Sequence, residues 1–278
     1  MNKALLVVGM HRSGTSALTG ALSILGVDIG TELLPAKSDE NAKGFFELKE
    51  VHSFHERLLL SGGRTWDTPW PVTSSWLDRI ATPSAKAELR GILERNFADS
   101  DLWTVKDPRL CHLLPLWREV LTDLAVDAAV IHIVREPAAV AASLAKRNGF
   151  TNDKSGLLWL EHNLAAEREG RGLQRAFLTY EDLIATKMGA LEPLATELGV
   201  KWPNGEEETA ADVETFLTRK LDHSSNRPSG QNREFDQGSD IVSGLDRLLR
   251  DLAATGEAGD EAWQAFDQVR EQQNVLVA

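Results

Sequence analysis

Short apolar runs alternate with amphipathic segments along the first two-thirds of the chain. The first run, ALLVV at residues 4–8, ends at Gly9, which is typical of a buried strand. Similar runs predict further strands at residues 102–106, 129–134 and 176–180. Each run is followed by a segment that can be helical, so the sequence predicts an α/β fold with a central parallel sheet flanked by helices.

Leucines at helical spacing follow the first run, at positions 18, 22 and 25, and Gly26 is a suitable helix end. An amphipathic pattern is also present between the last two predicted strands and twice near the C-terminus, where surface helices are expected. The helices predicted in this way cover residues 16–25, 157–171, 241–252 and 261–275.

The chain changes character at about residue 201, beyond which acidic residues outnumber basic ones two to one. The segment His223–Gly238 is polar and rich in turn formers, so we expect a long loop there. We therefore predict one domain, with its main part at residues 1–222 and a polar loop and acidic helical C-terminal extension at residues 223–278.

The composition narrows the class of protein. A net charge of −12 over 278 residues argues against a nucleic-acid surface, which needs a basic stripe. The single cysteine, Cys111, excludes an intramolecular disulfide and fits a reducing compartment. No apolar run has membrane-spanning length, and the one at the N-terminus is too short for a signal peptide. We expect a cytoplasmic enzyme; the oligomeric state stays open.

The segment GMHRSGTS at residues 9–16 has the spacing of a P-loop, GxxxxGK(S/T), and lies between a predicted strand and a predicted helix. The backbone N–H groups of residues 11–16 would therefore bind an anion, and Arg12 adds a planar donor. Thr15, however, stands where the lysine of a nucleotide-hydrolysing loop would be.

The sequence also lacks a strand-end aspartate for Mg²⁺, since the strand at residues 129–134 is followed by Arg135. We therefore expect the loop to hold one terminal anionic group without a metal. Two alternatives stay open: a divergent P-loop kinase or NTPase, and a nucleotide-binding module without transfer activity.

Three blocks resemble sulfotransferases that use 3′-phosphoadenosine 5′-phosphosulfate (PAPS). HRSGTS at residues 11–16 resembles their 5′-phosphosulfate loop. VREPAAVAAS at residues 134–143 resembles the segment in which a strand-end arginine and a serine eight residues later hold the 3′-phosphate. LTYEDL at residues 178–183 resembles the segment whose tyrosine lies near the adenine nucleotide.

The resemblance covers roughly residues 4–185 and implies a P-loop-like sulfotransferase fold with PAPS as the sulfuryl donor. The cofactor-binding residues that it implies are His11, Arg12, Ser13, Gly14, Thr15, Ser16, Arg135, Ser143 and Tyr180.

Sulfuryl transfer builds negative charge on oxygens, which cationic side chains and backbone donors can stabilise. Arg12 is one candidate. Lys106 in VKDPRL is the other, because it ends a predicted strand and would point into the crevice at the carboxyl ends of the sheet. Tyrosylprotein and some carbohydrate sulfotransferases have a lysine in a similar place. We expect the neighbouring Asp107 and Arg109 to form a structural ion pair.

An acceptor hydroxyl also needs a base. The segment NAKGFFELKE at residues 41–50 resembles the Gly-Phe-Trp-Glu block of a bacterial branch of the family, in a region where related enzymes use an acidic residue as the base. We assign this role to Glu47, which the two preceding phenylalanines would desolvate. His55 is the alternative base. His52 and His55 could form a metal pair, but no third ligand is suitably spaced, so no metal site is expected.

Two features are open to two interpretations. Trp66, Trp70 and Trp76 can line an acceptor pocket or close the core under a loop. Lys220 can reach the cofactor or balance a helix dipole. Bacterial sequences with this pattern imply a hydroxyl acceptor on a glycan, glycolipid or other metabolite.

Overall fold

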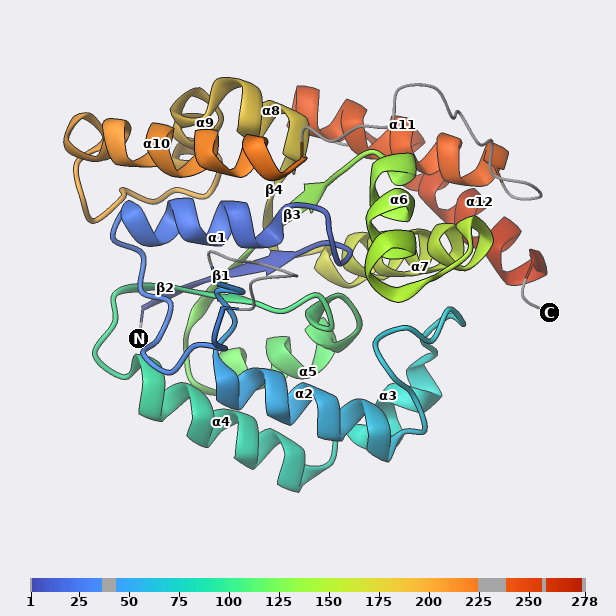
Figure 1. Cartoon of the computed structure of the whole chain (residues 1–278). Coiled ribbons are helices and arrows are strands. Elements are labelled where there is room, and N and C mark those ends of the chain that lie inside the picture. The colour runs from blue at the N-terminus through green and yellow to red at the C-terminus, as the bar shows by residue number, and fades with distance from the viewer. Residues whose placement is uncertain (1, 37–43, 225–238, 257–258, 277–278) are drawn as a thin grey trace.

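The computed structural model describes residues 2–36, 44–224, 239–256 and 259–276, with the side chains of 219–224 and 239 left aside. In this part of the chain four strands form one parallel sheet in the order β2-β1-β3-β4. Helices cover both faces of the sheet (Figure 1). The strands are β1 (Lys3–Val8), β2 (Leu102–Lys106), β3 (Asp127–Val134) and β4 (Gln174–Thr179). The predicted α/β class is confirmed.

The central strand β1 is buried on both faces, which explains its unbroken apolar sequence. Leu5 and Val7 pack into a hydrophobic cluster on one face of the sheet, whereas Leu6 and Val8 pack into a second cluster on the other. Val7 is paired with Lys106 of β2, so these two residues lie side by side at the carboxyl edge of the sheet.

The first face carries the helix that follows the glycine loop and three later helices, which lie above the sheet in Figure 1. Leu18 and Leu22 of the first helix point into this cluster, and Phe216 packs against Gly20 of the same helix. These helices are α1 (Thr15–Ile24), α8 (Tyr180–Thr186), α9 (Met188–Glu197) and α10 (Glu206–Ser224).

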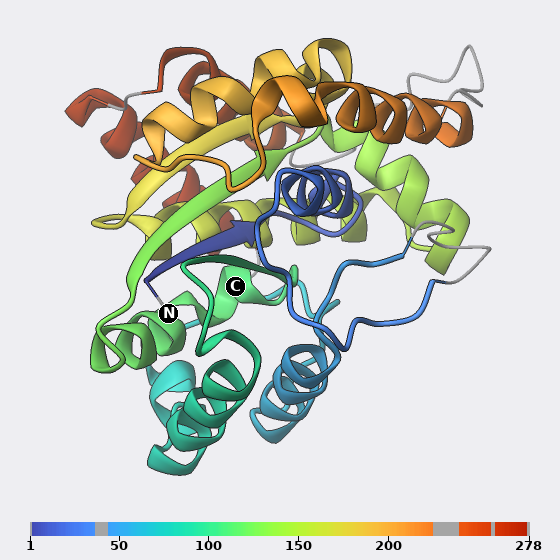
Figure 2. The ribbon, with the colours of Figure 1, turned by 90° about the vertical axis from the view of Figure 1, so that its left-hand side faces the viewer.

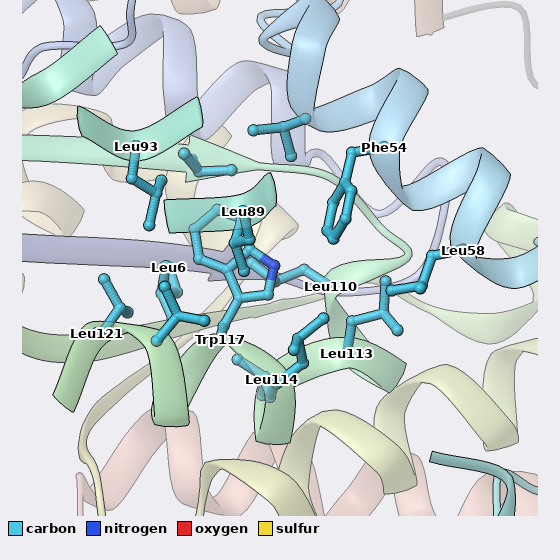
Figure 3. Packing of buried hydrophobic residues seen from close by; sticks show 14 of the residues in the cluster. Leu6, Phe54, Leu58, Leu89, Leu93, Leu110, Leu113, Leu114, Trp117 and Leu121 are labelled. Atoms are coloured by element: carbon cyan, nitrogen blue, oxygen red, sulfur yellow. The ribbon is translucent and has the colours of Figure 1, made fainter. Parts of the chain in front are cut away.

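The second face is covered by α2 (Lys49–Ser61), α3 (Ser74–Ile80), α4 (Pro83–Phe97) and α5 (Leu110–Asp123). Trp117 of α5 lies in the middle of this cluster, surrounded by leucines from three helices and by Leu6 of the sheet (Figure 3). This layer therefore holds the segment around Glu47 and α2 against the carboxyl half of β2.

A third cluster unites α6 (Pro137–Asn148) and α7 (Asn152–Gly170) with the C-terminal helices α11 (Ser239–Thr255) and α12 (Asp260–Leu276). Leu245 and Leu249 of α11 are fully buried, and α11 contacts both the edge strand β4 and α7. Figure 2 shows these two helices beside the layers of the main sheet. The acidic C-terminal part thus has an apolar face that joins the core.

Several boundaries differ from the prediction, and three of them matter for the site or the domain division. Tyr180 begins α8 instead of ending β4, because Thr179 caps this helix by accepting a hydrogen bond from the Asp182 N–H at 3.0 Å. The helix expected from residue 157 begins at Asn152, where Thr151 is its cap. Residues 223 and 224 end α10, and the rest of the predicted loop, 225–238, lies outside the described residues. Within the described ranges, no helix has the length and apolar character needed to cross a membrane.

Candidate active site

The carboxyl ends of the four parallel strands meet at one edge of the sheet. β1 leads into the glycine loop, β2 ends at Lys106, β3 is followed by Arg135 and β4 by Tyr180. Ligands of open α/β sheets bind at this edge. Four of the predicted site segments are therefore brought together by the topology alone.

The glycine loop has backbone angles that explain its glycines. Gly14, the N-cap of α1, has a φ of 91°, and a Cβ there would lie 2.2 Å from a ring carbon of Tyr180. Gly9 has a φ of 148°, and a Cβ there would lie 2.4 Å from the carbonyl oxygen of Ile133. The Gly9 N–H donates to the buried Cys111 thiol at 3.3 Å. The loop is thus fixed against both β3 and α5.

The N-terminal end of α1 presents unpaired backbone donors. The Ser13 N–H donates to the Met10 carbonyl at 3.1 Å, so it serves the loop itself. Within the described part of the chain, no protein acceptor pairs with the N–H groups of Gly14, Thr15 and Ser16. Free N–H groups in the first turn of a helix, together with the helix dipole, favour an anion at this point.

Side chains from three elements converge beside the loop. Arg12 Nε donates to Ser143 Oγ of α6 at 2.7 Å, and Arg135 Nη1 donates to the Arg12 carbonyl at 3.1 Å. The Arg135 guanidinium lies 4.5 Å from the centroid of the Tyr180 ring, a cation–π contact. Two arginines, a serine and a tyrosine therefore form one connected group next to Gly14.

Lys106 and Glu47 form a buried ion pair at the same edge. Lys106 Nζ lies 2.5 Å from Glu47 Oε1, and the two side chains are 2% and 8% exposed. The segment that carries Glu47 is tied to the glycine loop, because Ser16 Oγ donates to the Phe45 carbonyl at 3.1 Å. Glu47 is buried as expected, but the sequence did not predict this lysine as its partner.

His55 is buried in the core, and both of its ring nitrogens are hydrogen-bonded. Its Nε2 accepts a hydrogen bond from the Trp117 indole at 2.9 Å, so Nδ1 carries the proton and donates to Asp107 at 3.1 Å. The other Asp107 oxygen accepts from the Arg109 guanidinium at 2.9 Å. Burial by itself would raise the pKa of Asp107, but Arg109 and the hydrogen bond from His55 hold it well below its usual range. The predicted Asp107–Arg109 ion pair is present.

Among the described residues, neither His11 Nε2 nor Ser13 Oγ has a hydrogen-bond partner. The His11 ring lies 4.3 Å from that of Trp66, and its pKa is held well below the usual value by burial and then by Arg109. Ser13 is fully buried. The cofactor-binding roles of His11 and Ser13 stay predictions.

The three tryptophans have different environments. Trp66 stacks on Phe150 at 5.9 Å as well as contacting His11, Trp76 is buried and donates to the Gly62 carbonyl, and Trp70 is 53% exposed. Only Trp66 reaches the glycine loop. Lys220 belongs to α10, but its side chain lies outside the described residues.

A second group of buried polar residues carries no local sequence signal. The rings of His112 and His162 lie 4.5 Å apart, and those of His162 and His11 lie 6.1 Å apart. Burial lowers the pKa of His162 to about 4 and holds that of His112 well below its usual value, so both rings are neutral. Glu161, next to His162, is also buried. The sequence predicted α7 but not which of its polar residues face inwards.

No protein-family model matches this chain, and no curated protein matches its sequence. Among solved structures, a sulfotransferase domain from the curacin biosynthetic pathway matches with 15% identity, covering 97% of this chain and 98% of that domain, at a TM-score of 0.44.

A retinol dehydratase, solved in complex with androsterone and the inactive cofactor PAP, matches with 12% identity at a TM-score of 0.37, covering 97% of this chain and 80% of that one. In fold, this chain is similar to a sulfotransferase domain over nearly its whole length.

Proposed function

We propose that this chain is a sulfotransferase that moves a sulfuryl group from PAPS to a hydroxyl acceptor without a metal. The observation that carries the proposal is the connected group of Arg12, Arg135, Ser143 and Tyr180 beside a phosphate loop with Thr15 in place of lysine. Such a group suits a nucleotide with anionic substituents on both sides of the ribose.

The donor nucleotide would be held at two points. The N–H groups of Gly14, Thr15 and Ser16 would bind the 5′-phosphosulfate at the N-terminus of α1. Arg135 and Ser143 would bind the 3′-phosphate, with Arg12 linking this point to the loop through its bond to Ser143. Tyr180, in contact with both Gly14 and Arg135, would lie against the nucleoside. His11 and Ser13 would complete the loop that binds the donor nucleotide.

Lys106 and Glu47 would serve the transfer. The acceptor oxygen forms a bond to sulfur, the bond from sulfur to the bridging oxygen breaks, and the electron pair leaves with adenosine 3′,5′-bisphosphate. Lys106 would stabilise the charge that develops on these oxygens, as an oxyanion-hole donor does. Glu47 would accept the proton of the acceptor hydroxyl. Donor oxygens near Lys106 would compete with Glu47 for its ammonium group, which would release the carboxylate for this role.

Three observations favour this proposal over its alternatives. A P-loop kinase would need a carboxylate for Mg²⁺ near the loop, but both oxygens of Asp107 are engaged by Arg109 and His55. His55 as the base would need a free ring nitrogen, and both of its nitrogens are hydrogen-bonded. A binding module without transfer activity would have no need for a buried lysine–carboxylate pair beside its loop, since each buried charge costs stability.

The acceptor side is argued from Trp66, whose contact with His11 brings an aromatic surface to the loop. Aromatic rings of this kind stack on sugars and other flat or apolar bodies. We propose a glycan, glycolipid or other metabolite as the acceptor and a cytoplasmic location. We also propose that the main part of the domain comprises residues 1–222 and that residues 223–278 form its C-terminal extension.

The test is ligand stabilisation without metal, measured as the melting temperature of the whole chain in EDTA. Adenosine 3′,5′-bisphosphate at about 100 times its dissociation constant should stabilise the folded state by roughly 2.7 kcal/mol. MgATP in a matched metal-containing buffer should stabilise it much less. Equal or greater stabilisation by MgATP, with dependence on Mg²⁺, would favour the kinase alternative instead.

A further inference from the structure

A cavity is lined by residues of α3, α5, α7 and α12, four helices labelled in Figure 1. Its volume is about 550 Å³, which is within the range of small-molecule sites. Apolar side chains form much of its wall, among them Val72, Leu77, Leu116 and Leu164. Neither Lys106 nor any residue of the glycine loop lines it, so this cavity is separate from the proposed transfer site.

The one deeply buried acid of this cavity is Glu161, which is 3% exposed. Its carboxylate accepts hydrogen bonds from the Val72 N–H at 2.8 Å and from Gln273 Nε2 at 3.0 Å, both neutral donors. The only basic group within ion-pair distance in the described part of the chain is His112, at 3.7 Å, and that imidazole is neutral. Among the described residues, no lysine or arginine therefore lies within ion-pair distance of Glu161, although Arg64 and Arg168 act on its charge from farther away.

The arginines that line the cavity already have acidic partners. Arg168 pairs with Glu169, and Arg270 lies 3.3 Å from Asp267. The exposed residues of its lining include Asp78 and also Glu119, which pairs with Lys86. The cavity therefore combines an apolar wall with a buried carboxylate that has no ion-pair partner at contact distance.

A buried carboxylate without a countercharge is costly, and a cation supplied from outside can offset the cost. We propose that this cavity binds a small molecule with a protonated amine and an apolar body, its ammonium group on the carboxylate of Glu161 and its body against Leu77, Leu116 and Leu164. Burial raises the pKa of Glu161 to about 7, despite the hydrogen bonds from Val72 and Gln273 and the charges of Arg64 and Arg168, as expected for a buried carboxylate without an ion-pair partner at contact distance.

The neighbouring residue separates the cavity from the phosphate loop. Glu161 faces the cavity, whereas the His162 ring faces those of His112 and His11. An occupant of the cavity would thus be divided from the loop by neutral imidazoles. The inference does not depend on the proposed sulfuryl transfer and can be tested on the protein without any donor nucleotide.

The test uses three probes of one length: hexylamine, hexanol and hexanoate, titrated into the whole chain by calorimetry and by thermal melting. Hexylamine at about ten times its dissociation constant should raise the melting temperature by roughly 3–5 °C. Hexanol and hexanoate should bind at least about tenfold more weakly, because one lacks the charge and the other carries the wrong sign.

Two variants locate the amine. Glu161→Gln removes the charge at nearly constant volume and should weaken hexylamine at least about tenfold, while Glu119→Gln, at an exposed residue of the lining, should change its binding by less than about threefold. Ala81→Phe fills part of the cavity from a partly exposed position and should abolish binding even if Glu161→Gln proves unfolded. Circular dichroism establishes which variants are folded.

The proposal is overturned if hexylamine does not bind the wild type, if it binds folded Glu161→Gln or Ala81→Phe as tightly as the wild type, or if hexanoate binds as well as hexylamine. Equal binding of hexanol would likewise overturn it and make the cavity a site for neutral apolar molecules.

Discussion

The ammonium group of Lys106 lies 2.5 Å from a carboxylate oxygen of Glu47, and the two residues are separated by 59 positions in the sequence. Lys106 is the last residue of β2, at the carboxyl edge of the sheet, and Glu47 precedes α2 in the helical layer beside the sheet. Each charge is nearly excluded from water, so each depends on the other for compensation. This mutual dependence has consequences for both stability and turnover.

The two single substitutions should together lower the free energy of unfolding by more than the double substitution does. Glu47→Gln and Lys106→Met should each lower the free energy of unfolding by about 3–5 kcal/mol, since each leaves one buried charge unpaired. The double variant should lose clearly less than the sum. Urea unfolding of the four proteins measures this coupling. Simple additivity would mean that the two groups do not compensate each other.

For turnover, Glu47→Gln should lower the rate by about 10²–10⁴, the usual contribution of a general base, at unchanged affinity for adenosine 3′,5′-bisphosphate. The matched control is Glu50→Gln, three residues on, whose carboxylate pairs with Arg95 at the surface and should leave turnover nearly unchanged. Sulfate transfer from PAPS to an acceptor of the wild-type enzyme is the measurement, at a temperature where both variants are folded. Retained turnover in Glu47→Gln would exclude it as the base.

His55 should behave in the opposite way. His55→Phe removes the acceptor of the Trp117 indole and the donor to Asp107, and each group left unsatisfied should cost about 1–3 kcal/mol in unfolding free energy. Turnover per folded molecule should fall by less than about tenfold. A folded His55→Phe protein without activity, beside an active Glu47→Gln protein, would reverse the assignment of the base.

The strands and the glycine loop could be predicted because their signals are local. The run at residues 4–8 is apolar because β1 is buried on both faces, and the glycines at 9 and 14 stand where φ is positive or a side chain would collide. The apolar run at residues 176–178 predicts a strand that extends to Tyr180. The cap formed by Thr179 and Asp182 is a stronger local signal for a helix there.

The partners of the site residues could not be predicted in the same way. Which residue compensates Glu47 depends on how α2 and β2 pack across the sheet edge, and no spacing in the sequence encodes that distance. His55 fits a base by residue type alone, and only its environment shows that both ring nitrogens are used. The buried polar face of α7 could not be predicted either, since nothing in the sequence distinguishes Glu161 and His162 from exposed polar residues of a helix.

Arg135→Ala tests the two-point binding of the donor. It should weaken adenosine 3′,5′-bisphosphate by about 1.5–3 kcal/mol, the value of a charged hydrogen bond, but change adenosine 5′-phosphosulfate little, because this ligand has no 3′-phosphate. Ser143→Ala should show the same preference with a smaller effect. Calorimetric titration of both ligands measures it. Arg135 also donates a hydrogen bond to the Arg12 carbonyl. Equal weakening of both ligands would therefore mean that Arg135 stabilises the loop and does not bind the 3′-phosphate.

The raised pKa of Glu161 predicts a pH dependence of stability. In the unfolded chain this carboxyl titrates near 4.5, and in the folded protein near 7. Below pH 4.5 both states hold the proton, so its stabilising contribution is fully present; as the pH rises towards and through 7 that contribution is lost, by roughly 3 kcal/mol in total. Buried neutral histidines such as His162 act in the opposite direction, losing stability as the pH falls below about 6.5. The histidine contribution is common to the wild type and Glu161→Gln, so it cancels when their unfolding free energies are compared.

Relative to the wild type, Glu161→Gln should be least stable near pH 4.5 and should gain relative stability up to about pH 8. Glu119→Gln, which changes an exposed carboxyl of the same cavity, should show no such trend. A pH-independent difference for Glu161→Gln would mean that this carboxylate is well compensated, and it would remove one support for the amine site as well.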